Sequence, residues 1–460
     1  MKRSYEMDMC NGPLLGKILS YAIPLMLSGI LQLLFNAADV IVVGRFAGHE
    51  SLAAVGSTTA LINLLINVFI GLSVGANVLV AQYFGAGKDQ DVKDTVHTAV
   101  TISLICGAAL VGIGAFASKP LLILMGTPGD VLDKSALYMR IYFVGMPVIM
   151  LYNFGAAILR AIGDTKRPLY FLITAGVVNV LLNLVFVIVF HMGVAGVALA
   201  TALSQCISAA LVCRCLMKST GSYRLELSAL GINQRMLKRI ARIGLPAGFQ
   251  GAVFSISNVL VQSSLNSFGS VAMAGSTAAG NLEGFVYNAM NAVYQTNLSF
   301  TSQNIGGGKF SRINRILVLC LGVVTAIGLI MGGSFVLMGS QLLGIYSSDP
   351  EVIQCGLKRL IMICGPYFIC GWMDVMVGSL RGLGYAVMPM LVSLTGACGL
   401  RVLWILTIFQ WHRSLETLYL AYPVTWFVTA MAHLCCFLMI RKRFPKTDIV
   451  PSARDEEKNG

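Results

Sequence analysis

Charged residues are scarce in this sequence, and their scarcity excludes most soluble proteins. Asp, Glu, Lys and Arg make up 12% of the 460 residues, whereas a soluble domain usually carries about 25%. Hydrophobic residues make up 56% of the chain. A surface with so few charges cannot be mostly in contact with water.

The patterns typical of soluble enzymes and of metal sites are also missing. The twelve cysteines form no Cys-x-x-Cys pair or Cys/His cluster, and the five histidines show no metal-ligand spacing. The cysteines are therefore interpreted as small hydrophobic residues. Gly306–Lys309 is not a P-loop, because position 303 is glutamine and no strand precedes it. We expect no enzyme activity, no cofactor and no metal, apart from H⁺ or Na⁺ as a coupling ion.

Long hydrophobic runs are abundant, and each is long enough to cross a membrane. Met1–Met9 is polar and the first hydrophobic run is a full span, so no cleavable signal is expected. The predicted fold class is an all-α polytopic membrane protein with twelve transmembrane helices. The expected spans are residues 17–46, 53–84, 94–118, 135–161, 168–190, 194–217, 238–268, 271–305, 313–339, 352–382, 386–409 and 417–440.

The net charge of +13 has an uneven distribution along the chain. With a cytoplasmic N-terminus, the inner loops hold most of the 33 Lys and Arg residues, which is the positive-inside pattern of membrane proteins. The basic charge therefore indicates orientation and contact with anionic lipid head groups. No nucleic-acid partner is expected.

The two halves of the chain repeat one another at a separation of about 221 residues. Leu159–Gly163 matches Leu380–Gly384, and Gly85–Lys88 matches Gly306–Lys309. Six spans per half make the repeats parallel, and such repeats form two pseudo-symmetric six-helix bundles around a central cleft. The predicted division is an N-terminal lobe at 1–217, a cytoplasmic linker at 218–237, a C-terminal lobe at 238–440 and a cytoplasmic tail at 441–460.

Of the twenty Asp and Glu residues, only Asp39, Glu283 and Asp374 fall well inside predicted spans. A charge at membrane depth costs about 2.5–3.5 kcal/mol on insertion scales, so it needs a reason. One reason is a coupling ion, a proton relay or a cationic substrate, and the other is a hydrogen-bonded carboxylate that only fixes helix packing. Arg401 either pairs with Glu283 or Asp374 or extends toward the outer surface.

Polar side chains recur at helical spacing in the first half. Gln32, Asn36 and Asp39 share one helix face, and Asn179 and Asn183 share another. Together with Asn153 and Thr201 they predict a hydrated pocket, although interhelical hydrogen bonding alone would account for any one of them. Within it, the expected substrate-cleft residues are Asn36, Asn153 and Thr201.

Pro24 lies in the same predicted span as Asp39. Proline removes a backbone hydrogen bond and favours a kink. The kink is either static or a hinge that moves when Asp39 changes protonation.

These motifs together resemble the multidrug and toxic compound extrusion (MATE) transporters over essentially the whole chain, and in particular their DinF-like branch. The resemblance is carried by Pro24 with Ala38–Gly44, by Gln82–Lys88, by Leu159 and Arg160 with Gly163–Pro168, and by their echoes at Gln303–Lys309 and Leu380–Gly384.

The resemblance implies a cation or proton site at Asp39, with Gln32, Asn153, Asn179 and Thr201 as its polar companions. The second carboxylate of that site corresponds here to Asn183, which would leave Asp39 as the only titrating group. The NorM-like branch carries a glutamate in the seventh span. No acidic residue is present there, so Asp374 is the better candidate in the second lobe.

The resulting prediction is a bacterial cytoplasmic-membrane antiporter that exports amphipathic, often cationic, organic compounds against a proton or sodium gradient. We expect a monomer with both termini in the cytoplasm, and no partner other than substrate and lipid. The alternative is a lipid-linked precursor flippase, which would be expected to carry Arg or Lys inside its first-lobe spans. The predicted central set is mostly acidic or neutral, and this favours export.

Overall fold

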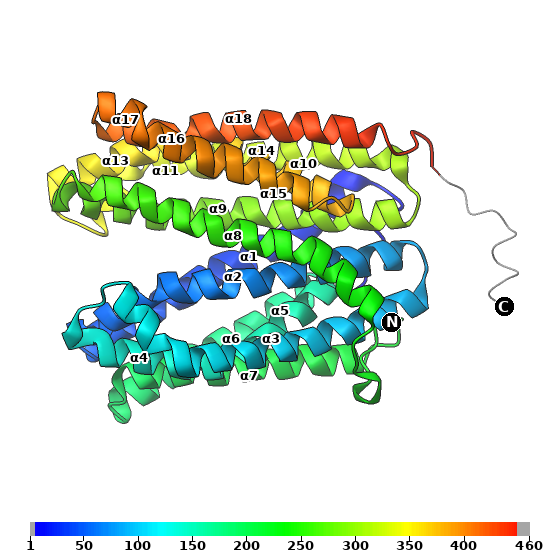
Figure 1. Cartoon of the computed structure of the whole chain (residues 1–460), viewed down its shortest axis with the longest axis horizontal. Helices are drawn as coiled ribbons and strands as arrows, with labels where there is room; N and C mark the ends of the chain where they lie inside the picture. Colours follow the sequence, from blue (N-terminus) through cyan, green and yellow to red (C-terminus); the bar gives the residue numbers. More distant parts are fainter. Residues whose placement is uncertain (1–4, 449–460) are drawn as a thin grey trace, which may run out of the picture.

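The computed structural model describes residues 5–448, and within them the chain is helical with no strand (Figure 1). The α-helices are α1 Leu14–Phe46, α2 His49–Gly85, α3 Asp89–Leu124, α4 Gly129–Val144, α5 Met146–Ala161, α6 Lys166–Leu184, α7 Gly193–Met217, α8 Gln234–Asn266, α9 Ser270–Gly306, α10 Ile313–Ile327, α11 Gly333–Leu337, α12 Gly339–Gly344, α13 Pro350–Cys364, α14 Phe368–Gly382, α15 Val387–Ser393, α16 Leu400–Leu406, α17 Ile408–Trp411 and α18 Leu415–Arg441. Three π-helical turns interrupt the spans: η1 Val185–Val189, η4 Gly328–Gly332 and η5 Leu394–Gly399.

The predicted fold class is confirmed. Within the described residues, nine helices are long and hydrophobic enough to cross a membrane, and two bent pairs qualify when each pair is taken as one span. These pairs are α4 with α5, bent by 49°, and α13 with α14, bent by 43°. Both bends lie next to prolines, Pro147 and Pro366, which cannot donate a backbone hydrogen bond.

Helix α9 completes the set of twelve, although it is too polar to stand among the nine. It is 37 residues long, and many of its Ser, Thr, Asn and Gln side chains are buried. A polar helix is stable at membrane depth only where protein or a water-filled cavity surrounds it. Its composition therefore indicates that α9 faces protein more than lipid.

Two bundles lie one above the other in Figure 1, the N-lobe (α1–α7) and the C-lobe (α8–α18). The first helix of each lobe starts in the hydrophobic core of the other. Ile18 and Tyr21 of α1 belong to the C-lobe core, and Met236 and Ile240 of α8 belong to the N-lobe core. Helices α1 and α8 therefore cross between the lobes.

The lobes meet at one end of the molecule, which we call the linker end because it carries the linker 218–233 and residues 5–13. Gln82 donates a 2.9 Å hydrogen bond to the carbonyl oxygen of Gly382, and Gln303 donates one of 2.7 Å to that of Ala161. The donors are repeat-related, and so are the acceptors, so the repeated glutamine holds each central helix against the opposite lobe.

The repeated Gly-x-Gly-Lys runs explain how the helices come so close there. A Cβ atom on Gly85 would collide with the carbonyl oxygen of Gln303, and one on Gly306 would collide with that of Gln82. Gly87 and Gly308 then take φ values of +65° and +67°, which end α2 and α9. The runs are helix C-caps, and they also form a contact between the lobes.

Residues 5–13 strengthen this contact by bonding to both lobes. The backbone N–H of Met7 donates to the carbonyl oxygen of Ile162, and the N–H of Met9 donates to Oε1 of Gln303. Asn304 returns a 3.0 Å hydrogen bond to the carbonyl oxygen of Met9. The linker end is therefore closed in this structure.

Candidate functional site: a polar chain in the N-lobe and a cavity in the C-lobe

Asp39 belongs to a chain of polar side chains that links three helices of the N-lobe. Asn183 of α6 donates to the carboxylate of Asp39 in α1, and also to Oδ1 of Asn179 at 3.3 Å. Asn179 donates in turn to the hydroxyl of Thr201 in α7 at 3.4 Å. The four-residue spacing of Asn179 and Asn183 places both amides on one face of α6. We call these four residues the polar chain.

The polar chain is largely enclosed and has one unused acceptor. Asn183 is fully buried, Asn179 is buried and Asp39 is half-buried. Among the described residues, no group donates a hydrogen bond to the buried Oδ1 of Asn183. A carboxylate beside an unpaired amide oxygen supplies hard oxygen ligands, which suit a hydrated proton or a hard cation.

The other predicted first-lobe residues lie outside the polar chain. Gln32 and Asn36 are exposed, and Asn153 donates at 2.8 Å to the backbone of Ile149 in its own helix. Pro24 is buried inside α1, which continues through it without a break. The assignment of Gln32 to the cation site, of Asn36 and Asn153 to the substrate cleft and of Pro24 to a hinge stays a prediction.

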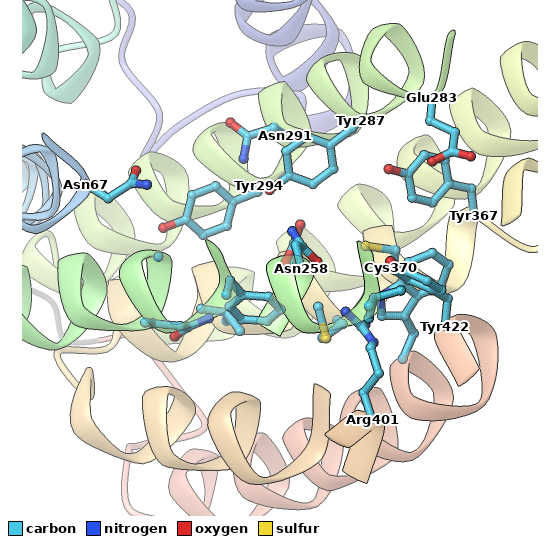
Figure 2. Close-up of a pocket in the computed structure, with 18 of the residues that line it drawn as sticks. Asn67, Asn258, Glu283, Tyr287, Asn291, Tyr294, Tyr367, Cys370, Arg401 and Tyr422 are labelled. Atoms are coloured by element: carbon cyan, nitrogen blue, oxygen red, sulfur yellow. The ribbon is translucent and has the colours of Figure 1, made fainter. Parts of the chain in front are cut away.

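The C-lobe contains a cavity of about 570 Å³, lined from α8, α9, α13, α14, α16 and α18. Figure 2 shows Tyr287, Asn291 and Tyr294 projecting into it from α9, and Arg401 reaching in from the opposite side. Asn67 of α2 lies at its border. The cavity therefore opens toward the region where the lobes meet.

Glu283 is paired within the cavity wall, but its partner is Arg359 and not Arg401, the partner considered from the sequence. The guanidinium of Arg359 donates to both carboxylate oxygens of Glu283, at 2.7 and 2.8 Å, and also to Ser276 at 2.6 Å. This two-pronged geometry is the strong form of an ion pair. The expectation that Arg401 pairs with Glu283 is therefore wrong, because Arg359 already occupies both oxygens.

Arg401 is neither paired with an acid nor extended toward the surface. Its side chain is 2% exposed and lies over the ring of Tyr422, 4.2 Å from the ring centroid. Its one recorded hydrogen bond, to Thr425, is 3.5 Å long, and its Nε atom has no partner among the described residues. The π-helical turn η5 ends just before Arg401 and changes the direction in which this residue points.

Asp374 and Arg381 lie two helical turns apart on α14, and both line the cavity. Arg381 donates to Tyr294 at 2.7 Å and to Gln250 at 2.9 Å, and its Nε has no partner within residues 5–448. Over the same range no side chain is recorded as donating to the carboxylate of Asp374. The predicted pairing of Arg401 with Asp374 is likewise absent.

The charge of this cavity corrects a second expectation. Its charged lining residues are Glu283, Asp374, Arg359, Arg381 and Arg401. Since Glu283 neutralises Arg359, two guanidinium groups remain against one carboxylate. The sequence predicts a central set that is mostly acidic or neutral, and for the C-lobe this is wrong.

Comparison with known proteins now identifies the family. The MatE family model matches residues 24–185 and 246–406, so it matches each half once. The two matches start 222 residues apart and end 221 apart, in agreement with the repeat. This chain belongs to the MatE family. It is a multi-pass membrane transporter, and the predicted family is confirmed.

Relatives in this family resemble the chain over nearly its whole length. The "Probable multidrug resistance protein YoeA" of Bacillus subtilis is 27% identical, over 89% of this chain and 90% of that protein. The "FAD transporter" of Shewanella oneidensis is 23% identical, over 94% and 95%. A solved "Outward-facing conformation of a multidrug resistance MATE family transporter of the MOP superfamily" superposes with a TM-score of 0.89 at 22% identity, over 96% of this chain and 99% of that one.

Several lining residues of this MatE protein do not stand out in the sequence. Arg359 follows Lys358 near the start of a predicted span, where a basic pair is typical of a membrane boundary. Arg381 belongs to the repeated motif Leu380–Gly384. The repeat indicates gene duplication and does not by itself mark Arg381 as a binding-site residue. Asn67 and Asn258 are single polar residues in long helices, and only the packing of α2 against α8 gives them a shared cavity.

Proposed function

We propose that this MatE protein exports small amphipathic organic compounds across the bacterial cytoplasmic membrane, in exchange for a cation bound at Asp39. The polar chain carries the proposal. It joins a half-buried carboxylate of α1 to two buried amides of α6, and it leaves one amide oxygen without a donor among the described residues. A proton or Na⁺ on Asp39 would remove the cost of this charge at membrane depth.

The coupling step would involve Asp39 alone among first-lobe acids, since its partner on α6 is the amide Asn183. Binding of a cation would change which hydrogen bonds Asn183 and Asn179 make, because both amides are shared between neighbours. Since α1 also reaches into the C-lobe core, a change at Asp39 can act on both lobes. No cofactor other than H⁺ or Na⁺ is part of the proposal.

In the membrane, the linker end would be cytoplasmic and the protein would act as a monomer. The basic residues of the linker and of the start of α8 support this orientation. The closed linker end then corresponds to a state that is shut toward the cytoplasm. The flippase alternative requires basic residues inside the first-lobe spans. The two cavity arginines that lack an ion-pair partner among the described residues, Arg381 and Arg401, belong to the C-lobe, so the proposal stays with export.

The test is the variant Asp39→Asn in proteoliposomes. We expect it to fold and insert normally but to lose substrate-dependent proton or sodium flux, because an amide cannot hold a proton or a cation as a carboxylate does. Asp130→Asn is the control, since Asp130 is an exposed acid in the first turn of α4. Flux of Asp39→Asn at the rate of the unmodified protein would contradict the proposal, and the response to a pH jump or a sodium jump would identify the ion.

A further inference from the structure

The guanidinium of Arg401 is poorly satisfied in the C-lobe cavity. It has five N–H donors, but the part of the chain that the structure describes gives it one hydrogen bond, at 3.5 Å. The side chain is 2% exposed and its Nε lacks a partner among the described residues. A buried cation without an anion is costly, so this arrangement indicates that a negatively charged group belongs there.

Arg381 repeats this pattern on another wall of the cavity. Its side chain is 6% exposed, and its two hydrogen bonds go to the neutral groups of Tyr294 and Gln250. Its Nε is also without a partner within residues 5–448. Two buried guanidinium groups that line one cavity without forming an ion pair make a site for an anion more than for a cation.

The acids of the cavity do not compensate both arginines. Glu283 is committed to Arg359 through both oxygens. Asp374 is then the only remaining carboxylate among the lining residues, so the lining keeps an excess of one positive charge. A cationic substrate would enter against this excess charge.

The remaining wall of the cavity is aromatic. Trp426 stacks on Tyr367 with ring centroids 5.3 Å apart, and it meets Tyr422 edge-on at 5.5 Å. Tyr287 and Tyr294 face the cavity from α9 (Figure 2). Such rings bind planar ring systems, and a volume of about 570 Å³ is in the usual range for a small-molecule site.

From this combination we infer that the C-lobe cavity is a substrate site for aromatic compounds that carry a phosphate or carboxylate group, with Arg401 and Arg381 holding the anion. This inference adds the substrate class to the proposed function. The role of the cavity in transport rests on that proposed function. While the carboxyl group of Asp374 is charged, it would lower the affinity for the anion, because Asp374 lines the same cavity. The site therefore selects its substrates by the sign of their charge.

Binding of flavin mononucleotide to the purified full-length chain in detergent tests the inference. Riboflavin is the matched neutral probe because it has the same ring system without the phosphate, and ethidium is an aromatic cation. We expect the phosphate to increase the affinity about tenfold or more over riboflavin, because it would accept charge-assisted hydrogen bonds from Arg401 and Arg381. Equal affinity for the two flavins, or tighter binding of ethidium, would overturn the inference.

Two cavity variants should act in opposite directions, which a folding defect cannot imitate. Arg401→Gln should reduce the affinity for flavin mononucleotide to that for riboflavin, while riboflavin binding persists. Asp374→Asn should tighten binding of the phosphate compound, because it removes the one opposing carboxylate. Arg413→Gln is the control, since Arg413 is exposed outside the cavity, and it should leave both affinities unchanged.

A lipid head group offers the same phosphate chemistry and has to be distinguished. Phosphatidylglycerol and phosphatidylcholine are added separately as competitors of bound flavin mononucleotide. If neither lipid displaces flavin mononucleotide, the result supports the aromatic anion site. Displacement by phosphatidylglycerol alone would show a lipid site and overturn the inference. Since binding is measured without an ion gradient, failure of the coupling role of Asp39 would not affect this result.

Discussion

Among single residues, the buried Glu283–Arg359 pair and the exposed Lys358–Glu416 pair form a natural comparison. Both pairs join α13 to another helix, but the side chains are 8% and 15% exposed in the first and 52% and 51% in the second. We predict that Glu283→Gln lowers the free energy of unfolding by about 3–5 kcal/mol, because it leaves the guanidinium of Arg359 buried without its countercharge. Denaturant unfolding in detergent micelles measures the change.

The matched variant Glu416→Gln should cost less than about 1 kcal/mol, since solvent screens the exposed pair. An equally small effect for Glu283→Gln would mean that the cavity wall relaxes around Arg359.

At the scale of single residues, sequence spacing predicts which side chains share one helix face, but it does not predict contacts between different helices. The spacing of Asn179 and Asn183 on one helix is enough to predict their common face, and the structure joins them to Asp39. The partner of Glu283 lies on a different helix, so sequence spacing could not identify it.

Among the elements, α1 and α8 are the helices on which movement between the lobes depends. Both start in the core of the opposite lobe. Both also contain a proline, Pro24 in α1 and Pro246 in α8, close to the point where the helix passes from one lobe to the other. Pro24→Ala should slow transport about fivefold without loss of stability. It restores a backbone hydrogen bond of about 1 kcal/mol, which favours the straight form of the helix. Initial rates in proteoliposomes and a thermal unfolding curve test both parts.

The repeat predicts the same outcome for Pro246→Ala. Pro423 lies inside α18, whose buried hydrophobic side chains belong to the C-lobe core, so Pro423→Ala is the control and should not slow transport. Equal slowing by all three variants would show a general effect of helix stiffness. Most of the spans follow from hydrophobic runs, and their predicted ends lie within six residues of the observed helix ends. The bends of α4–α5 and α13–α14 and the π-turns could not, since they depend on packing against neighbouring helices.

For the whole molecule, the repeated glutamines predict that the linker end opens as one unit. Gln82 bonds the carbonyl oxygen of Gly382 and makes no recorded hydrogen bond to residues 5–13 among the described residues. The N–H groups of Met7 and Met9 are nevertheless protected only while α5 and α9 stay in place, since their acceptors belong to Ile162 and Gln303. Loosening the lobes at Gln82 should therefore expose these distant amides.

We predict that Gln82→Ala increases hydrogen–deuterium exchange at Met7 and Met9 about fivefold, the effect of losing about 1 kcal/mol from the closed state. Gln90→Ala is the control, since the recorded side-chain hydrogen bond of Gln90 goes to Asp94 on the exposed surface of α3 at the same end. Unchanged exchange in Gln82→Ala would mean that residues 5–13 hold the linker end closed on their own. Increased exchange would show that Gln82 and Gln303, which are repeat-related and 221 residues apart, both keep the linker end closed. These two hydrogen bonds would then contribute to the energy barrier for the conformational change that moves access from one side of the membrane to the other.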